Sequence, residues 1–268
     1  MTSKNIYGSK GWARLWKKLE QEGNVGINYF INPYLYPEIT HFLQNNPDSV
    51  VVDFGAGTNI LGIEYIFGYK DIIPGLFRSK KLEIARDNIF QFVGLEGEKE
   101  LVERGKGYLN DIGNPAQISV IQHNLVKGNR LPFKKGSIDL AISRNFLMHL
   151  SLEDLDYHFQ QVRRVLKEKG KYIFAILNPE YELSKFTESG KFLLNGKLYN
   201  FPHGSKGEHG TFYHYFKTLD YYMNLFKKFD FKILKKIECK PLNNKFKKTH
   251  PRYYQKRIPM GLVFVLER

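Results

Sequence analysis

The chain has 268 residues, of which 42% are hydrophobic and 15% aromatic, so it is not a disordered protein and can fold around a large core. Its single cysteine, Cys239, excludes an intrachain disulfide and a thiolate metal cluster. The net charge is +14, and residues 217–257 hold 13 Lys or Arg against three acids. Such a basic surface can attract nucleic acid, an acidic peptide or a phosphorylated small molecule, or it can simply be a solvated face.

Aromatic residues mark the first predicted elements. Apolar residues recur at helical spacing at Trp12, Leu15, Trp16 and Leu19. This spacing predicts a short amphipathic helix, and we expect residues 1–35 to form an aromatic lid beside the main domain. Pro37 then predicts the start of a helix that runs to about Gln44.

Short apolar runs alternate with helical segments from residue 49 onward. Such runs suit strands that are buried on both faces of a parallel sheet. The predicted strands are Ser49–Phe54, Phe90–Leu95, Ile118–Gln122, Ile138–Ser143 and Lys171–Leu177. Between the last two, Ser151 and Asp154 predict a helix start with a capping box, and Gly170 predicts its end. The alternation predicts a doubly wound α/β sheet.

The alternation stops after Asn178-Pro179. The following residues are rich in Gly, Phe, Tyr and His, which predicts an inserted cap. A helix at Leu219–Phe226 and two strands, Phe229–Cys239 and Met260–Glu267, then complete the sheet. The predicted organisation is a lid at 1–35, a cofactor-binding core at 36–180, a substrate cap at 181–218, and a closing helix and hairpin at 219–268.

A glycine turn follows the first predicted strand. Asp53 ends the strand, and Gly55 and Gly57 come next, where glycine permits unusual backbone angles and the close approach of a ligand. Ile60 stands where a dinucleotide fingerprint needs a third glycine, and no phosphate-loop ending follows. Asp53 suits a cationic aminoacyl group better than a pyrophosphate. The alternative is a plain tight turn.

Polar residues at two more strand ends favour a nucleoside-containing ligand. Glu96 ends the second predicted strand, where a carboxylate can bind both hydroxyls of a ribose. Asn124 and Leu125 follow the third strand, and an amide with an apolar side chain suits the edge and face of adenine.

With these motifs in order, the chain resembles the class I S-adenosylmethionine-dependent methyltransferases, of the small-molecule kind similar to methyltransferase type 11. Asp53–Thr58 matches the family's Asp-X-Gly-X-Gly-Thr loop, and Glu96 matches its acidic residue after the second strand. Leu131–Asp139 resembles the run before the fourth strand, and Val165–Lys171 the turn into the fifth. The resemblance covers residues 48–180 and implies a doubly wound, mostly parallel seven-stranded Rossmann-like sheet with an antiparallel final hairpin.

The resemblance also implies S-adenosylmethionine as cofactor. We assign its binding to Asp53, Gly55, Ala56, Gly57, Glu96, Asn124, Leu125, Ser143 and Arg144. Two departures from the family pattern stand out. The 39 positions from Gly57 to Glu96 are many more than usual, so residues 65–85 look inserted, and Asn124 replaces an Asp near adenine.

Three histidines are candidate general bases for an acceptor that must lose a proton: His149, His209 and His214. For His149 a packed histidine at a helix start is the alternative. His209 and His214 could bind a metal with His203, but the three lack acidic companions and compact spacing, so we expect no metal. The run from Asn178 to Tyr181 resembles an element of adenine N-methyltransferases, yet it follows the fifth strand, and we interpret it as a strand-ending turn.

The predicted function is methyl transfer from S-adenosylmethionine to an oxygen or nitrogen nucleophile of a small molecule or peptide. The basic stretch Lys240–Arg257 predicts an acidic partner. The alternatives are an RNA-directed methyltransferase and a nucleic-acid- or peptide-binding module without turnover, although no recognised RNA-binding motif accompanies the charge. No apolar run reaches about 18 residues, so we expect no membrane span, no secretion signal and a cytoplasmic location.

Overall fold

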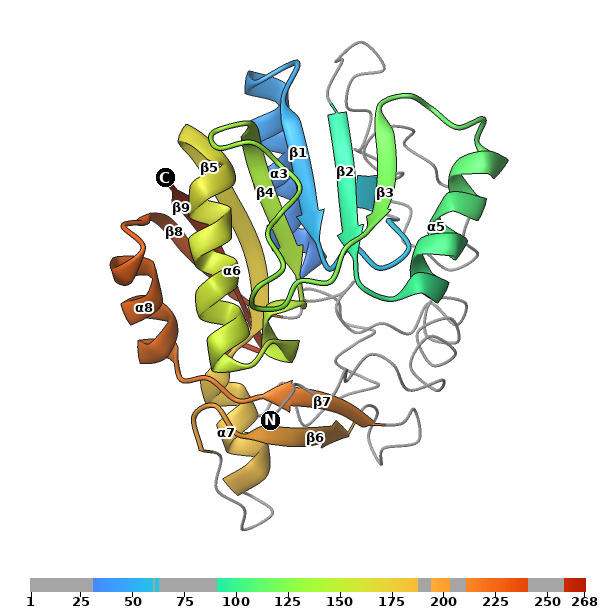
Figure 1. Ribbon diagram of the computed structural model, residues 1–268. Helices are drawn as coiled ribbons and strands as arrows, with labels where there is room; N and C mark the ends of the chain where they lie inside the picture. The colour runs from blue at the N-terminus through green and yellow to red at the C-terminus, as the bar shows by residue number, and fades with distance from the viewer. Residues whose placement is uncertain (1–30, 60, 63–90, 188–193, 203–210, 241–257) are drawn as a thin grey trace.

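The computed structural model describes residues 31–59, 61–62, 91–187, 194–202, 211–240 and 258–268 (Figure 1). Most of the predicted lid, the predicted insertion at 65–85, His203, His209 and residues 241–257 lie outside these ranges. Within them, no helix is both long and apolar enough to cross a membrane.

Seven strands form one sheet in the order β3-β2-β1-β4-β5-β9-β8. The strands from β3 to β5 pair in parallel, whereas β9 is antiparallel to both β5 and β8. The predicted mostly parallel seven-stranded sheet is therefore confirmed. Its strands are β1 (Val50–Phe54), β2 (Gln91–Glu96), β3 (Ile118–Gln122), β4 (Ile138–Arg144), β5 (Leu166–Leu177), β8 (Lys232–Cys239) and β9 (Gly261–Glu267).

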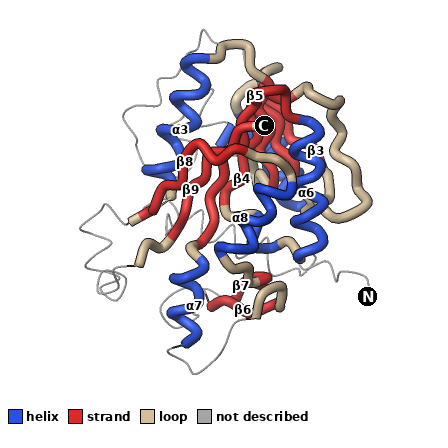
Figure 2. The backbone as a smooth tube through the Cα atoms, turned by 90° about the vertical axis from the view of Figure 1, so that its left-hand side faces the viewer, coloured by secondary structure: helices blue, strands red, loops and turns tan. Residues whose placement is uncertain are grey.

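Helices cover both faces of this sheet (Figure 2). On one face, α3 (Asn32–Asn45) packs through Leu35, Ile39 and Leu43, whose spacing of four residues makes one apolar stripe. On the other face lie α6 (Leu152–Val165) and α8 (Leu219–Lys228). A further helix, α5 (Lys99–Asp111), packs beside β2 and β3.

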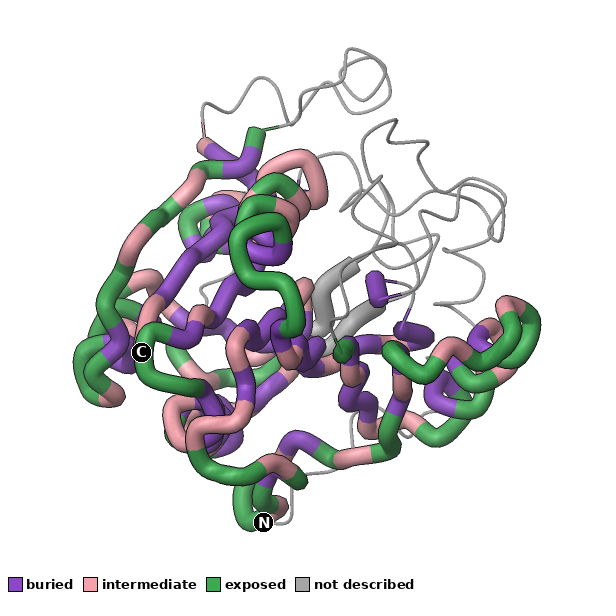
Figure 3. The backbone as a smooth tube through the Cα atoms, turned by 90° about the horizontal axis from the view of Figure 1, so that it is seen from above, coloured by how far each residue is buried: buried purple, intermediate pink, exposed green. Residues whose placement is uncertain are grey.

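Strand β1 shows why the central strands are almost wholly apolar. Val51 packs against the α3 side, whereas Val52 and Phe54 pack against α6 and α8. Successive side chains of a strand point to opposite faces, so a strand covered on both faces buries every residue. Figure 3 shows the buried segments concentrated in the interior and the exposed segments around the outside. Asp53 is a charged residue in this buried strand and therefore needs a separate explanation.

The start of α6 confirms Ser151 as its predicted N-cap, but the predicted end of the helix is wrong. Ser151 Oγ accepts a hydrogen bond from the Asp154 backbone N–H at 3.1 Å. The helix ends at Val165 rather than near Gly170, because Leu166 is extended (φ −62°, ψ 141°) and enters the core as the first residue of β5. Gly170 instead permits a tight bend inside β5, where a Cβ would lie 2.9 Å from the Lys167 carbonyl oxygen.

The helix before β1 also differs from its predicted bounds. It begins at Asn32, so Pro37 lies inside α3 rather than at its start, and the predicted boundary at residue 35 falls within a helix. The second proline, Pro33, lies in the first turn, where a missing backbone N–H is tolerated.

A smaller group of elements lies beyond the carboxyl ends of the parallel strands. There, β6 (Leu198–Pro202) and β7 (Thr211–Tyr215) form a two-stranded antiparallel sheet, and α7 (Pro179–Thr187) follows β5 directly. Figure 1 shows these elements below the main sheet, on the side to which the arrowheads of β1 and β2 point. Asn178 ends the strand and opens α7, because its Oδ1 accepts a hydrogen bond from the Glu180 backbone N–H at 3.1 Å.

Candidate active site

Glu96, at the end of β2, links the glycine turn after β1 to the start of α5. Its Oε2 accepts a hydrogen bond from the Gly57 backbone N–H at 2.9 Å, and its Oε1 accepts one from the Glu98 N–H at 2.9 Å. The side chain is buried, and burial raises its pKa to about 7 although the backbone donors favour the ionised form. Glu96 therefore lies at the predicted ribose position with its orientation fixed by main-chain groups.

Asp53 is a second buried carboxyl group at the same edge. Burial raises its pKa to about 7, an effect that nearby Arg144 opposes and Glu96 reinforces. Within the described ranges its Oδ1 has no hydrogen-bond partner. A buried polar atom without a partner is costly, so this oxygen is available to a group beyond the described residues, such as a ligand.

The glycine turn has left-handed backbone angles, with φ of +71° at Gly55 and +58° at Gly57. A Cβ at Gly55 would lie 2.4 Å from Cδ2 of Phe146, the residue just before the short 3-10 helix η2 (Leu147–His149). Position 55 must therefore be glycine to make room for the Phe146 ring, whether or not a ligand is bound. Ala56 is buried between the two glycines, and its N–H donates to the Leu95 carbonyl at 3.1 Å.

Arg144 ends β4 and adds a cation to this edge. Its Nη1 donates to the Tyr36 hydroxyl at 3.1 Å, and Asn32 Nδ2 donates to the same oxygen at 3.2 Å. Because Tyr36 and Asn32 both belong to α3, that helix positions the guanidinium as well as covering the sheet. One cation and two carboxyl groups thus meet at the carboxyl ends of β1, β2 and β4.

The predicted adenine residues lie in the loop after β3. Asn124 is exposed, and Leu125 is buried against residues of the α6 side. The preceding residue, His123, has a buried Nε2 without a partner among the described residues, and burial lowers the pKa of this imidazole. His123 is a polar group that the sequence analysis did not single out.

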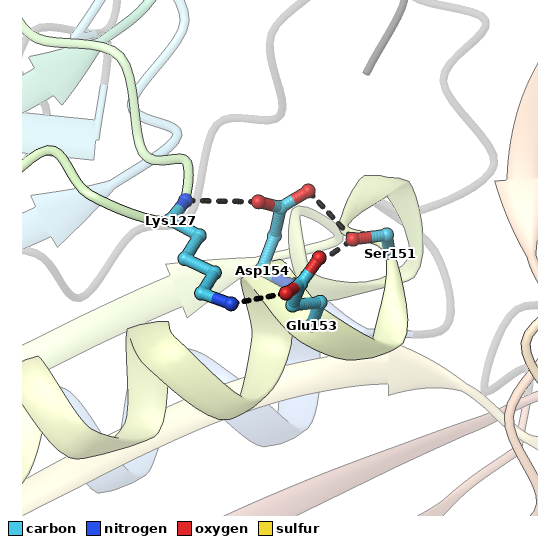
Figure 4. Close-up of polar contacts among 4 residues, drawn as sticks. All are labelled: Lys127, Ser151, Glu153 and Asp154. Carbon is cyan, nitrogen blue, oxygen red and sulfur yellow. Dashed lines mark hydrogen bonds and ion pairs between the residues drawn. The ribbon is translucent and has the colours of Figure 1, made fainter. Parts of the chain in front are cut away.

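This loop is fastened to the start of α6 (Figure 4). The Lys127 backbone N–H donates to Asp154 Oδ1 at 2.8 Å, and Ser151 Oγ donates to Asp154 Oδ2 at 2.6 Å. Lys127 Nζ also pairs with the exposed Glu153. The capping residue Asp154 therefore has a second role, since it fixes the loop that carries Asn124.

Ser143 lies on the α6 side of the sheet, in a buried chain of polar groups. Its hydroxyl is 2.8 Å from the Tyr172 hydroxyl, which is 2.9 Å from His158 Nε2. Burial lowers the pKa of His158 to about 3 and raises the pKa of the Tyr172 phenol, so both groups are neutral at pH 7. The assignment of Ser143 to the cofactor stays a prediction.

The structure brings together two of the three candidate bases. The ring centroids of His149, on η2, and His214, on β7, are 5.0 Å apart at an interplanar angle of 77°. His149 is partly exposed, whereas His214 is buried. His209 lies outside the described residues.

Comparison with known proteins identifies a family for part of the chain and a shared fold for most of it. Residues 77–174 match a family model described as a methyltransferase domain. A crystal structure of an S-adenosylmethionine-dependent methyltransferase from Mesorhizobium loti has a TM-score of 0.57 at 18% identity, covering 87% of this chain and 97% of that one. Residues 77–174 therefore carry a methyltransferase domain. No curated protein matches the chain.

Two further solved structures resemble this methyltransferase. A protein from Pyrococcus horikoshii OT3 has a TM-score of 0.63 at 15% identity, covering 97% of this chain and 99% of that one. The geranyl diphosphate C-methyltransferase from Streptomyces coelicolor A3(2) has a TM-score of 0.54 at 15% identity, covering 87% of this chain and 79% of that one. It was solved with Mg2+, geranyl diphosphate and S-adenosyl-L-homocysteine. These likenesses concern the fold. With the family match, they confirm the predicted methyltransferase enzyme and its cofactor S-adenosylmethionine.

The polar groups of the edge fit this cofactor. Asp53 Oδ1, which has no hydrogen-bond partner among the described residues, suits an ammonium group, and the Arg144 guanidinium suits a carboxylate. Both Glu96 oxygens accept backbone hydrogen bonds, and a carboxylate with about four lone-pair sites still has room for a ribose hydroxyl. A cationic ligand would also favour the ionised forms of Asp53 and Glu96, which burial alone opposes.

Sequence analysis missed further residues of this edge: Tyr36, Phe146, and Asp154 as a loop anchor. Only Asp154 carried a local signal, because its place in the capping box was recognised. The others are brought to the edge by elements that are distant in the sequence, and a single sequence holds no pattern for such contacts.

Proposed function

We propose that this methyltransferase acts on an oxygen or nitrogen nucleophile of a small molecule or peptide. The observation that carries the proposal is the contact between His149 and His214 beside the cofactor edge. An O–H or N–H acceptor loses a proton when it is methylated, and imidazole can take up a proton near neutral pH.

The roles of the edge residues follow from their chemistry. Bound S-adenosylmethionine supplies an activated methyl group, so the protein needs mainly to align the acceptor and exclude water. Asp53 would hold the ammonium group and Arg144 the carboxylate, while Glu96 would hold the ribose hydroxyls. Asn124 and Leu125 would contact the adenine edge and face.

The proposal includes an acidic acceptor. The net charge of +14 creates a positive potential that attracts anions, and the basic stretch begins at Lys240. The main chain of Lys240 is joined to α3, because the Tyr34 hydroxyl donates to its carbonyl oxygen at 2.9 Å. A cytoplasmic location is also proposed, and the buried single cysteine Cys239 agrees with a reducing compartment.

Binding of S-adenosylhomocysteine tests the cofactor site. Calorimetry should give a micromolar dissociation constant, on the order of −8 kcal/mol. Glu96→Ala should weaken binding by about 1.5–3 kcal/mol through loss of charge-assisted hydrogen bonds. The matched control Glu100→Ala removes an exposed carboxylate from the first turn of α5 and should change nothing. Absence of binding to the folded wild-type protein would contradict the proposal.

Two measurements separate the alternatives. A binding module would show no turnover of methyl-labelled S-adenosylmethionine with any acceptor. An RNA-directed enzyme would bind a mixed oligonucleotide with a steep negative dependence of log K on log salt, whereas a small-molecule enzyme should show a shallow one.

A further inference from the structure

A buried carboxyl–imidazole pair lies behind the half-buried ring of His149. Glu182, on α7, is 6% exposed, and its Oε1 is 3.1 Å from Nδ1 of His214, which is also 6% exposed. His214 in turn contacts the His149 ring. The three side chains come from α7, β7 and η2, and of the three only His149 is partly exposed.

Lys217 fixes the relative position of the two rings. Its side chain is 2% exposed, and Nζ donates to the carbonyl oxygens of Leu147 at 3.0 Å and Met148 at 3.2 Å. Both acceptors belong to η2, and Lys217 follows β7 by two residues. The lysine therefore ties the strand that carries His214 to the helix that carries His149.

This group of side chains is adjacent to the glycine turn at Gly55 and Gly57. The residue before η2 is Phe146, whose ring lies over Gly55. His149 follows that ring by three residues, and its backbone N–H donates to the Phe146 carbonyl at 3.0 Å. The contact between Phe146 and the glycine turn therefore places η2, which carries His149, next to the predicted cofactor site.

Burial of these groups costs free energy of folding, which points to a role beyond packing. Glu182 and Lys217 are both nearly inaccessible, and apolar side chains of similar volume commonly stabilise an interior as well or better. The arrangement does, however, suit a proton acceptor. An ionised Glu182 requires a proton on His214 Nδ1, and its charge stabilises an imidazolium nearby.

We propose that Glu182, His214 and His149 form the proton-accepting site for the methyl acceptor, an inference that rests on the proposed function. The acceptor oxygen or nitrogen forms a bond to the methyl carbon, and the sulfur–carbon bond breaks with its electron pair remaining on sulfur. The acceptor proton passes to a nitrogen of His149, which is the catalytic base. His214 and Glu182 are positioning residues that orient the base and balance its new charge.

Nuclear magnetic resonance on histidine-labelled protein tests this site without a known acceptor, with S-adenosylhomocysteine as the probe. We expect His214 to carry its proton on Nδ1 in the wild-type protein. S-adenosylhomocysteine should shift the ring signals of His149 and leave those of His41, an exposed histidine on α3, unchanged. Glu182→Gln should lower the pH at which the paired rings take up protons by about one unit, and the exposed control Glu180→Gln should not.

Each opposite result would overturn the proposal. A proton on His214 Nε2 would exclude Glu182 as its charge partner, and this measurement needs only the wild-type protein. Unchanged His149 signals with saturating S-adenosylhomocysteine would place the ring away from the transfer site. Equal titration of both rings in Glu182→Gln and wild type would show that the charge of Glu182 does not act on His214 or His149. Failure of calorimetric binding, by contrast, would count against the proposed function and leave the Glu182–His214 pair open to measurement.

Discussion

If Asp53 and Glu96 bind the cofactor as proposed, its affinity should depend on pH. Burial raises each pKa to about 7, so a large fraction of both carboxyl groups is protonated at neutral pH before a ligand arrives. If a cationic ligand requires both in ionised form, its affinity should fall by about tenfold per pH unit per group below pH 7. Calorimetry with S-adenosylhomocysteine between about pH 6 and pH 8 measures this slope.

Asp53→Asn provides the decisive variant for this dependence. The amide keeps the size of the side chain but cannot ionise, so the slope should become shallower by one proton while absolute affinity falls. Affinity that does not vary with pH in the wild-type protein would show that these carboxyl groups do not meet the cationic part of the ligand.

The same two residues affect stability in the ligand-free protein. Their pKa values are raised in the folded state, so the stability they contribute is fully present below the unfolded pKa values near 4 and is lost as pH rises through about 7. His158 acts in the opposite direction, because its lowered pKa of about 3 gives stability that is lost as pH falls below the unfolded value near 6.5.

Individual site residues were predictable where they directly follow an apolar strand. Asp53 and Glu96 are of this kind, since the carboxyl ends of parallel strands meet at one edge. Glu182 and Lys217 are not, because their partners lie 32 and 70 positions away in the chain. Their burial is a product of tertiary packing, which a run of neighbouring residues does not encode.

At the scale of elements, Asp154 links the start of α6 to the loop after β3. Asp154→Asn should weaken S-adenosylhomocysteine binding, because the Lys127 N–H then loses a charged acceptor and the loop that carries Asn124 is less well fixed. Hydrogen bonds to a charged group contribute about 1.5–3 kcal/mol, part of which should appear as lost affinity measured by calorimetry.

The adjacent residue supplies a matched control. Glu153 also pairs with Lys127, but through exposed side chains, and such pairs contribute little. Glu153→Gln should therefore leave affinity and stability unchanged. Equal effects of the two substitutions would show that the loop does not depend on the buried Asp154 contact.

Element boundaries were predicted best where both flanks carried a signal. The strand Ile118–Gln122 has its predicted bounds, and Ser151 caps α6 as expected. The end of α6 differs from the prediction because Gly170 is not the stop signal. The burial of Leu166 in the sheet decides where the helix ends. Tertiary burial overrides a local signal in this case.

For the whole molecule, Phe159 joins three parts of one core. Its ring centroid lies 5.5 Å from that of Tyr172 in the sheet and 5.6 Å from that of Phe226 on α8. Phe159→Ala should lower the free energy of unfolding by about 3–5 kcal/mol, measured by urea denaturation. Gln160→Ala, at the next and exposed position of α6, should change it by less than about 0.5 kcal/mol. A loss below about 1 kcal/mol for the Phe159 variant would mean that the core readily closes around the gap.

The sheet was predictable from the sequence because its apolar runs are continuous and regularly spaced. The small sheet of β6 and β7 was not, since its strands contain Gly-flanked aromatic and polar residues without a clear period. The resulting contact between η2 and β7, which places His149 beside His214, therefore became visible only in the folded chain.

The position of β9 has a consequence for biosynthesis. This strand is later in the sequence than every other strand of the sheet, yet it lies between β5 and β8. While the ribosome is still translating the segment before β9, the nascent chain has an open, apolar edge at β5, and β8 has no strand with which to pair. Such an edge invites association with other chains. Until β9 emerges, this edge of the newborn polypeptide is therefore a site at which aggregation can begin.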